Sequence, residues 1–407
     1  MVIVIGLILL GYVLSIVFNK KVDILNPSTI FSLLILGTYF ISTLRLSLLQ
    51  SVYPLWFSVL ILLMIFMFYL GNKSSVVFKQ PNTELDIHYF PSTMKTISFI
   101  FWLAIMVSFA MMVNKLGLPP ALSKGNRAEY FISGWGTIVI LQSSFFALLM
   151  FDRFNKNALK SFFWIYSVSI FILAVLLSNK FQIIYMIILY IVARHSYKKQ
   201  IKISTLIKLS LVIVFLFALL FEFVYEDMYG VSLQAMQLGY RMVTPEKLSF
   251  LTQPYLYVAF NYENLFNFLN SETHTLFGLR TFSAFIDILH LESLYPQSLL
   301  AYVEEWKSLL KINSLTTGTM FQDFAQDGGI IWMIICTYFC GLWSGVCYRR
   351  FKVNKNFISF FLYAASTVAI FTSFFSNVFT SKVTILNLIV SILIGLILQI
   401  EFVFRRL

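Results

Sequence analysis

Charged residues are scarce in this chain. They make up 12% of its 407 residues, whereas hydrophobic residues make up 59%; a soluble domain carries about 25% charged residues. The apolar residues form continuous runs long enough to cross a bilayer core of about 30 Å as helices. This pattern excludes a soluble protein, and it excludes a transmembrane β-barrel, whose strands alternate between apolar and polar residues. The sequence therefore predicts an all-α polytopic membrane protein.

Motifs for nucleotide and metal chemistry are also missing. The chain has no G-x-x-x-x-G-K-[ST] phosphate loop, no H-E-x-x-H pair and no G-x-S-x-G nucleophile turn. Its three cysteines share one predicted helix without a histidine nearby, which is typical of small packing residues rather than of a zinc site. They are Cys336, Cys340 and Cys347. We therefore expect no metal and no cofactor.

The net charge of +12 does not indicate a nucleic-acid partner. Lys and Arg lie at the ends of the apolar runs, as topology signals do, and they collect in alternate connections. The positive-inside rule then places the N-terminus outside the cytoplasm and the C-terminus inside. The predicted spans are 1–18, 27–44, 54–70, 96–113, 135–151, 161–178, 181–193, 206–224, 328–348, 357–376 and 383–403, eleven in all.

One stretch departs from the alternation of apolar runs and short connections. We expect three parts: 1–224 with the first eight spans, 225–327 as a large loop outside the cytoplasm, and 328–407 with the last three spans. The loop holds most of the acidic residues of the chain. Ionisable groups near membranes cluster where water or substrate is handled, so the loop is the candidate active-site region.

Two segments inside the loop have patterns of their own. Residues 296–310 place Leu299, Val303, Trp306 and Leu310 on one helical face. This predicts an amphipathic helix at the membrane–water boundary. Residues 256–268 are rich in aromatic residues but only half apolar. Their rings either stack on sugars or pack the loop onto the helices.

Short turn signals delimit several helices. Asn26-Pro27-Ser28 predicts the start of the second span, because Pro fits the first turn of a helix. The segment 117–120, Gly-Leu-Pro-Pro, ends the fourth span. A tight turn, Ser178-Asn179-Lys180, joins spans six and seven, where the lysine either serves a substrate or only reaches the phospholipid headgroups.

Cations and candidate bases are predicted on the same outer side. The cations are Arg127, Lys180, Arg241 and Arg280. Arg presents a planar fork of donors that suits phosphate oxygens, so these residues would hold a lipid-linked pyrophosphate and stabilise the charge on a leaving diphosphate. An acid or a histidine would accept the proton of an attacking sugar hydroxyl. The candidates are Asp287, His274, His290, Glu292, Asp323 and Asp327. The alternative is a solvated loop whose charges only keep it soluble.

Four short motifs stand out along the chain. They are Asn26-Pro27-Ser28; Arg127 with Tyr130, Phe131 and Gly134; Ser178-Asn179-Lys180; and Thr316 to Gly329 with Phe321, Asp323 and Phe324. Together with the spans and the large outer loop, they resemble the Wzy-type oligosaccharide repeat-unit polymerases of bacterial O-antigen and capsule synthesis. The third motif has Lys where the family usually has Arg.

The resemblance implies a metal-independent glycosyltransferase of polysaccharide biosynthesis at the periplasmic face of the bacterial inner membrane. Such enzymes move a glycan from undecaprenyl pyrophosphate onto the next lipid-linked repeat, and the diphosphate is already a good leaving group. We expect Arg280 and Arg241 to bind the donor pyrophosphate, supported by Arg127 and Lys180. His290 or Asp323 is the expected base. Membrane lipid and a chain-length regulator are the expected partners.

Other functions remain open. An O-antigen ligase uses the same donor with a different acceptor, and its loss leaves finished polymer on the lipid carrier. A flippase for lipid-linked oligosaccharides would show two related halves and short loops, and this sequence has no internal repeat. A membrane acyltransferase is disfavoured because the histidines have no acidic partner in a span.

Overall fold

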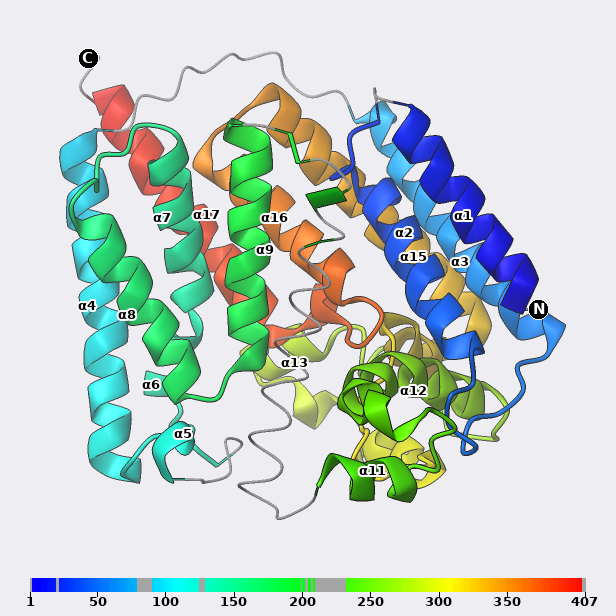
Figure 1. Ribbon diagram of the computed structural model, residues 1–407. Helices are drawn as coiled ribbons and strands as arrows, with labels where there is room; N and C mark the ends of the chain where they lie inside the picture. The colour runs from blue at the N-terminus through cyan, green and yellow to red at the C-terminus, as the bar shows by residue number, and fades with distance from the viewer. Residues whose placement is uncertain are drawn as a thin grey trace. The chain divides into compact units, whose positions relative to one another are not determined.

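The computed structural model describes residues 2–19, 22–78, 90–123, 129–198, 200–201, 204–205, 208 and 232–404. This part of the chain is built of helices and contains no strand, as the sequence predicted (Figure 1). Five of its helical segments are long and apolar enough to cross a membrane: Leu55–Val77, Pro91–Ser123, Trp135–Phe154, Met320–Val353 and Lys382–Gln399. Shorter apolar helices occupy Val2–Phe18, Pro27–Thr43, Phe162–Leu176 and Phe357–Thr372.

These helices coincide with predicted spans, and α9 (Lys180–Tyr197) covers the predicted seventh span. The predicted eighth span, 206–224, lies outside the described residues except for Lys208. The count of eleven therefore stays a prediction, as does the large outer loop.

The chain divides into two compact units. The first comprises 1–77, 201–346 and 369–381, and the second comprises 78–200, 347–368 and 382–407. The candidate residues of the loop from 232 onward all belong to the first unit, together with the N-terminal helices and most of α15 (Met320–Val353).

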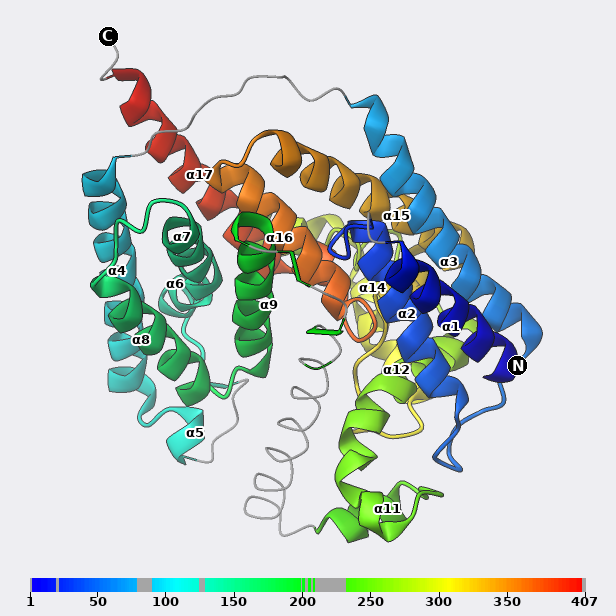
Figure 2. The same ribbon diagram turned by 45° about the horizontal axis from the view of Figure 1, so that its top comes forward.

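In the first unit, α2 (Pro27–Thr43) packs against α1 (Val2–Phe18), α3 (Leu55–Ser74) and α12 (Thr252–Leu269). Figures 1 and 2 show α1, α2 and α3 side by side. The start of α2 was predicted correctly: Asn26 Oδ1 accepts hydrogen bonds from Ser28 N at 3.1 Å and Ser28 Oγ at 2.8 Å. Phe31 of α2 stacks on Phe68 of α3, with ring centroids 3.9 Å apart.

Helices α3 and α15 approach each other through glycines. A Cβ at Gly71 would overlap the backbone oxygen of Tyr338, and a Cβ at Gly341 would overlap that of Phe68. A Cβ at Gly345 would come within 2.9 Å of the Asn72 backbone oxygen, and Gly341 and Gly345 form a G-x-x-x-G pair. Small residues at this spacing let membrane helices come into backbone contact.

The helices in the rest of the first unit are short, apart from α12. They are α11 (Leu233–Gly239), α12, α13 (Ser283–Leu289), α14 (Gln297–Ala301) and the 3-10 turns η2 (Glu246–Leu251), η3 (Glu292–Leu294), η4 (Tyr302–Leu309) and η5 (Val378–Thr380). Helix α12 is buried on most of its surface, and the rings of Phe260, Tyr262 and Phe268 are inside the protein. Burial favours packing over sugar stacking for these three rings.

The predicted amphipathic helix over 296–310 is present as two helical segments of different type. Only Gln297–Ala301 is α-helical, and Tyr302–Leu309 continues as a 3-10 helix. Its apolar side is also covered by protein, because Leu299 and Val303 pack against a buried cluster of Leu276, Leu279 and Ile286. The expectation that this segment lies at the membrane boundary stays a prediction.

The second unit contains α4 (Pro91–Leu116), α5 (Pro120–Ser123), α6 (Trp135–Ile140), α7 (Gln142–Phe154), α8 (Phe162–Leu176), α9, most of α16 (Phe357–Thr372) and α17 (Lys382–Phe404). Helix α7 packs against α4, α8, α9 and α17. Polar bonds reinforce this packing: Ser144 of α7 donates from N and Oγ to Asn387 Oδ1 of α17, at 2.9 and 2.6 Å. As predicted, α4 ends at Gly117, whose φ is +81°.

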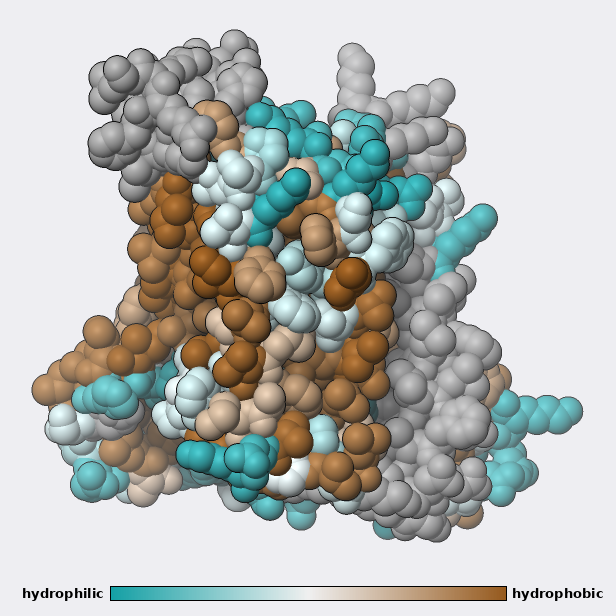
Figure 3. Space-filling model, turned by 90° about the vertical axis from the view of Figure 1, so that its left-hand side faces the viewer, coloured by the Kyte–Doolittle hydropathy of each residue, from teal (hydrophilic) through white to brown (hydrophobic). Residues whose placement is uncertain are grey.

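The face that carries α4 and α8 is apolar. Figure 3 shows a wide band of hydrophobic side chains there, with hydrophilic residues toward the upper and lower ends of the view. Phe99 and Ile100 of α4 and Trp164 and Ile165 of α8 are among its exposed side chains. A continuous apolar surface of this kind suits lipid contact.

Candidate functional site

The candidate site is built where α15 breaks. Gly328 and Gly329 depart from helical geometry, and Gly329 has a φ of +66°, which favours glycine. Backbone oxygens just before the break lose their helical partners. The carbonyls of Gln326 and Asp327 instead accept hydrogen bonds from Leu276 N at 2.9 Å and Phe277 N at 3.1 Å. The loop segment 276–281 is thereby fastened to α15.

The buried Asp327 carboxylate fixes the same segment from its other side. Its Oδ1 accepts a hydrogen bond from Arg280 N at 2.9 Å, and its Oδ2 accepts one from Thr281 N at 2.5 Å. Thr281 Oγ1 in turn accepts a hydrogen bond from Trp332 Nε1, just after the break, at 3.1 Å. Asp327, which was a candidate base, therefore acts here as a backbone anchor for Arg280.

The Arg280 guanidinium is held on two of its three nitrogens. Its Nε donates to Gln326 Oε1 at 2.9 Å, and its Nη2 donates to the Val303 carbonyl at 2.5 Å, with Glu304 Oε1 at 3.5 Å. Nη1 makes no hydrogen bond to a described residue, and the side chain is 24% exposed. Arg280 is thus a positioned cation with donors left for a ligand.

Asp323 lies one helical turn before Asp327 on α15 and is half-buried. It is within electrostatic reach of both Arg280 and Asp327. Next to it, Gln322 and Thr319 are buried, and neither the Gln322 amide nor Thr319 Oγ1 has a hydrogen-bond partner among the described residues. Buried polar groups are normally paired, so Gln322 and Thr319, at the start of α15, have polar atoms that could still donate and accept hydrogen bonds.

The other predicted site residues are placed less favourably. His290 ends α13 with a φ of +53°, and its ring is exposed and makes no hydrogen bond to a described residue. Arg241 is exposed and has a φ of +49°; its carbonyl accepts a hydrogen bond from Leu48 N at 3.0 Å. Lys180 begins α9 in the second unit, after Asn179 caps that helix. Arg127 lies outside the described residues.

Two further candidate bases of the loop are also accounted for. His274 stacks on Tyr302, with ring centroids 3.6 Å apart, and its Nδ1 lies 3.0 Å from Glu305 Oε2. The His274 hydrogen bond lowers the pKa of the Glu305 carboxyl below its usual range. Asp287 is exposed on α13. His274 therefore has a structural partner, and Asp287 is a surface group.

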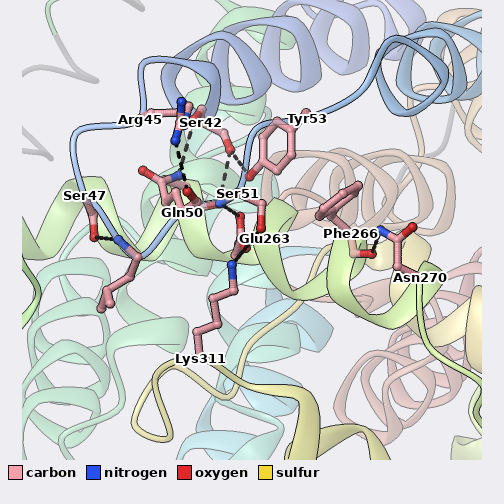
Figure 4. Close-up of polar contacts among 12 residues, drawn as sticks. Ser42, Arg45, Ser47, Gln50, Ser51, Tyr53, Glu263, Phe266, Asn270 and Lys311 are labelled. Atoms are coloured by element: carbon pink, nitrogen blue, oxygen red, sulfur yellow. Dashed lines mark hydrogen bonds and ion pairs between the residues drawn. The ribbon is translucent and has the colours of Figure 1, made fainter.

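The sequence did not reveal a buried ion pair at the loop between α2 and α3. Glu263 of α12 is fully buried, and its carboxylate accepts hydrogen bonds from Lys311 Nζ at 2.5 Å, Ser51 Oγ at 2.8 Å and Ser51 N at 3.0 Å. Figure 4 shows Ser51 and Lys311 meeting at this carboxylate. The only sequence signal for this pair was Glu263 itself, an acidic residue in an aromatic-rich segment. Its partners Ser51 and Lys311 are far away in the sequence.

Tyrosines and amides surround this pair. Tyr53 Oη lies 2.8 Å from Ser42 Oγ, and the Gln50 amide donates to the Ser42 carbonyl at 3.3 Å (Figure 4). Burial raises the pKa of the Tyr53 hydroxyl well above its usual value, and the Glu263 charge adds to the rise. Burial likewise raises the pKa of Tyr255 to about 12. Both hydroxyls therefore stay neutral, and the cluster fixes the loop 45–54 onto α12.

No known protein family, curated protein or solved structure matches this chain. Function must therefore be inferred from the residues themselves.

Proposed function

We propose that this chain polymerises undecaprenyl-pyrophosphate-linked oligosaccharide repeat units into O-antigen or capsular polysaccharide at the periplasmic face of the bacterial inner membrane. The observation that carries the proposal is Arg280, a cation fixed by Asp327, Gln326 and Val303 where the apolar part of α15 begins. A fixed Arg at the end of a membrane helix suits the diphosphate of a lipid-linked glycan.

In this proposal Arg280 binds the donor diphosphate through Nη1, and the diphosphate also replaces the exposed Glu304 carboxylate near Nη2. A hydroxyl of the acceptor sugar attacks the anomeric carbon of the donor glycan. The new glycosidic bond forms as the bond from that carbon to the diphosphate oxygen breaks, and Arg280 stabilises the charge on the leaving diphosphate. The hydroxyl proton passes to the Asp323 carboxylate, which is the preferred base.

Buried Gln322 and Thr319 are the candidates for contacts to a sugar that enters beside Asp323. Hydroxyl groups both donate and accept hydrogen bonds, and so match an amide and a hydroxyl that lack partners. His290 is the weaker candidate base, because nothing in the described residues orients its ring. Arg241, Lys180 and Arg127 remain candidates for phosphate binding, and a chain-length regulator remains a candidate partner.

The test is complementation of a host strain from which the gene has been deleted. We expect the deletion to leave surface polysaccharide as a single-repeat band, and Arg280→Ala to restore no polymer although the protein reaches the membrane. Lys307→Ala is the matched control, because Lys307 is a cation of the same region paired with Glu304 on the surface; it should restore the full ladder. A normal ladder from Arg280→Ala would remove Arg280 from the site, and finished polymer left on the lipid carrier after deletion would indicate a ligase.

A further inference from the structure

Helix α13 turns apolar side chains away from the protein. Phe282, Phe285 and Leu289 recur at spacings of three and four residues, so they share one face of the helix. All three are exposed, Leu289 by 60%, and Phe277 before them is 74% exposed. We call Phe282, Phe285 and Leu289 the α13 apolar face. Exposed large side chains gathered in this way mark an interaction surface.

The opposite side of α13 has a different character. Ala284 and Ile286 are buried, and Asp287 is exposed about half a turn away from Phe285. The apolar side of the neighbouring 297–309 segment packs against Leu276, Leu279 and Ile286, not against α13's exposed side chains. The α13 apolar face is therefore an apolar surface that the described part of this loop does not cover.

The segment that leads into α13 is bonded to a helix that is long and apolar enough to cross a membrane. Phe277 N donates to the Asp327 carbonyl at 3.1 Å, and Trp332 of α15 donates to Thr281 at 3.1 Å. These bonds place α13 at the residues where the apolar part of α15 starts. There, Ile331 is 74% exposed on a helix long and apolar enough to cross a membrane. Lipid that covers Ile331 therefore reaches the level of α13.

We propose that the α13 apolar face inserts into the membrane at this end of α15, with its rings at the boundary between headgroups and acyl chains. The occupant is bilayer lipid. Phenylalanine and leucine on one face, with the only ionisable group of the helix on the other, are the pattern of an interfacial helix. Insertion fixes the depth of Arg280, two residues before Phe282. If the proposed function also holds, Arg280 then meets the diphosphate at headgroup level.

The experiment measures the membrane depth of α13 with nitroxide labels. Phe285→Cys and Asp287→Cys variants of the full chain are labelled and reconstituted into vesicles of phosphatidylcholine and phosphatidylglycerol; the native cysteines are buried. Power saturation then compares collisions with oxygen, which partitions into lipid, and with a water-soluble nickel chelate. The Asp287→Cys label is the matched control on the same helix.

We expect the ratio of oxygen to nickel collisions to be several-fold higher at residue 285 than at residue 287. Equal access of nickel to both labels would show that the face is in water and would overturn the proposal. Protection of residue 285 from both reagents would show that protein covers it and would overturn the proposal equally. Leu289→Cys replaces Phe285→Cys if the latter does not fold. This result does not depend on polymerase activity, so it separates insertion from the proposed function.

Discussion

Replacing Lys311 by methionine removes the cation that faces the buried Glu263 carboxylate and keeps a side chain of similar length. Removing one partner of a fully buried ion pair costs about 3–5 kcal/mol. Water screens part of this pair because the Lys311 side chain is 35% exposed, and Ser51 still donates two hydrogen bonds to the carboxylate. We therefore expect Lys311→Met to cost about 2 kcal/mol of unfolding free energy.

The double variant Glu263→Leu/Lys311→Met isolates the interaction between the two residues. A buried ion pair replaced by apolar residues is often as stable as the original. The double variant should therefore be more stable than Lys311→Met alone, although the first substitution also removes an acceptor from Ser51.

The parent protein, the two single variants Glu263→Leu and Lys311→Met, and the double variant form a double-mutant cycle. Thermal unfolding of the purified proteins in detergent ranks these four by stability. Lys307→Met is the control, because Lys307 pairs with Glu304 on the surface and its loss should cost less than about 1 kcal/mol. Two results would refute the reasoning: a Lys311→Met protein as stable as the parent, or a double variant whose loss equals the sum of the two single losses.

Three further predictions concern local contacts. Gly341→Leu should lower the melting midpoint in detergent, because the larger side chain overpacks the α3–α15 crossing at a cost of about 1–3 kcal/mol. Gly11→Leu is the control: it lies at a position with open space and should leave the midpoint near that of the parent. Equal effects of the two substitutions would contradict the close approach of α3 and α15. The lowered pKa of Glu305 means that its bond to His274 stabilises the loop above pH 4.5 and is lost as the pH falls further. The protection of the residue 274 amide against hydrogen exchange should fall there, and Glu305→Ala should show the weaker protection at neutral pH already. Asn26→Ala should cost about 1 kcal/mol through the lost cap of α2, and an unchanged midpoint would show that the cap contributes nothing.

Apolar run length and turn chemistry were enough to predict most of the helices. Runs of apolar residues identify membrane-type helices because each must satisfy its own backbone hydrogen bonds. The predicted helix start at Asn26 and the predicted helix end at Gly117 are confirmed. Both could be predicted because their signals are local in the sequence. The existence of these helices, in other words, depends on neighbours a few residues away.

The parts that sequence reasoning missed depend on distant neighbours. The apolar side of 297–309 was identified from the sequence, but periodicity does not say whether lipid or protein covers it. In the structure it packs against Leu276 and Leu279. Helix α13 has only 7 residues, too few for the sequence alone to predict a helix there. The partners of Arg280 come from Val303 and Gln326, and those of Glu263 come from the first loop and from Lys311. No local pattern brings these residues together.

The most direct measurement for the central claim is polymer formation by the purified protein. Lipid-linked repeat units extracted from the deletion strain are mixed with the protein in vesicles, without nucleotide sugar, and products are separated by chain length. We predict a ladder of lipid-linked polymer with the parent protein and unchanged single repeats with Arg280→Ala. Single repeats that persist with the parent protein, or products that form only when a different acceptor is added, would contradict the claim.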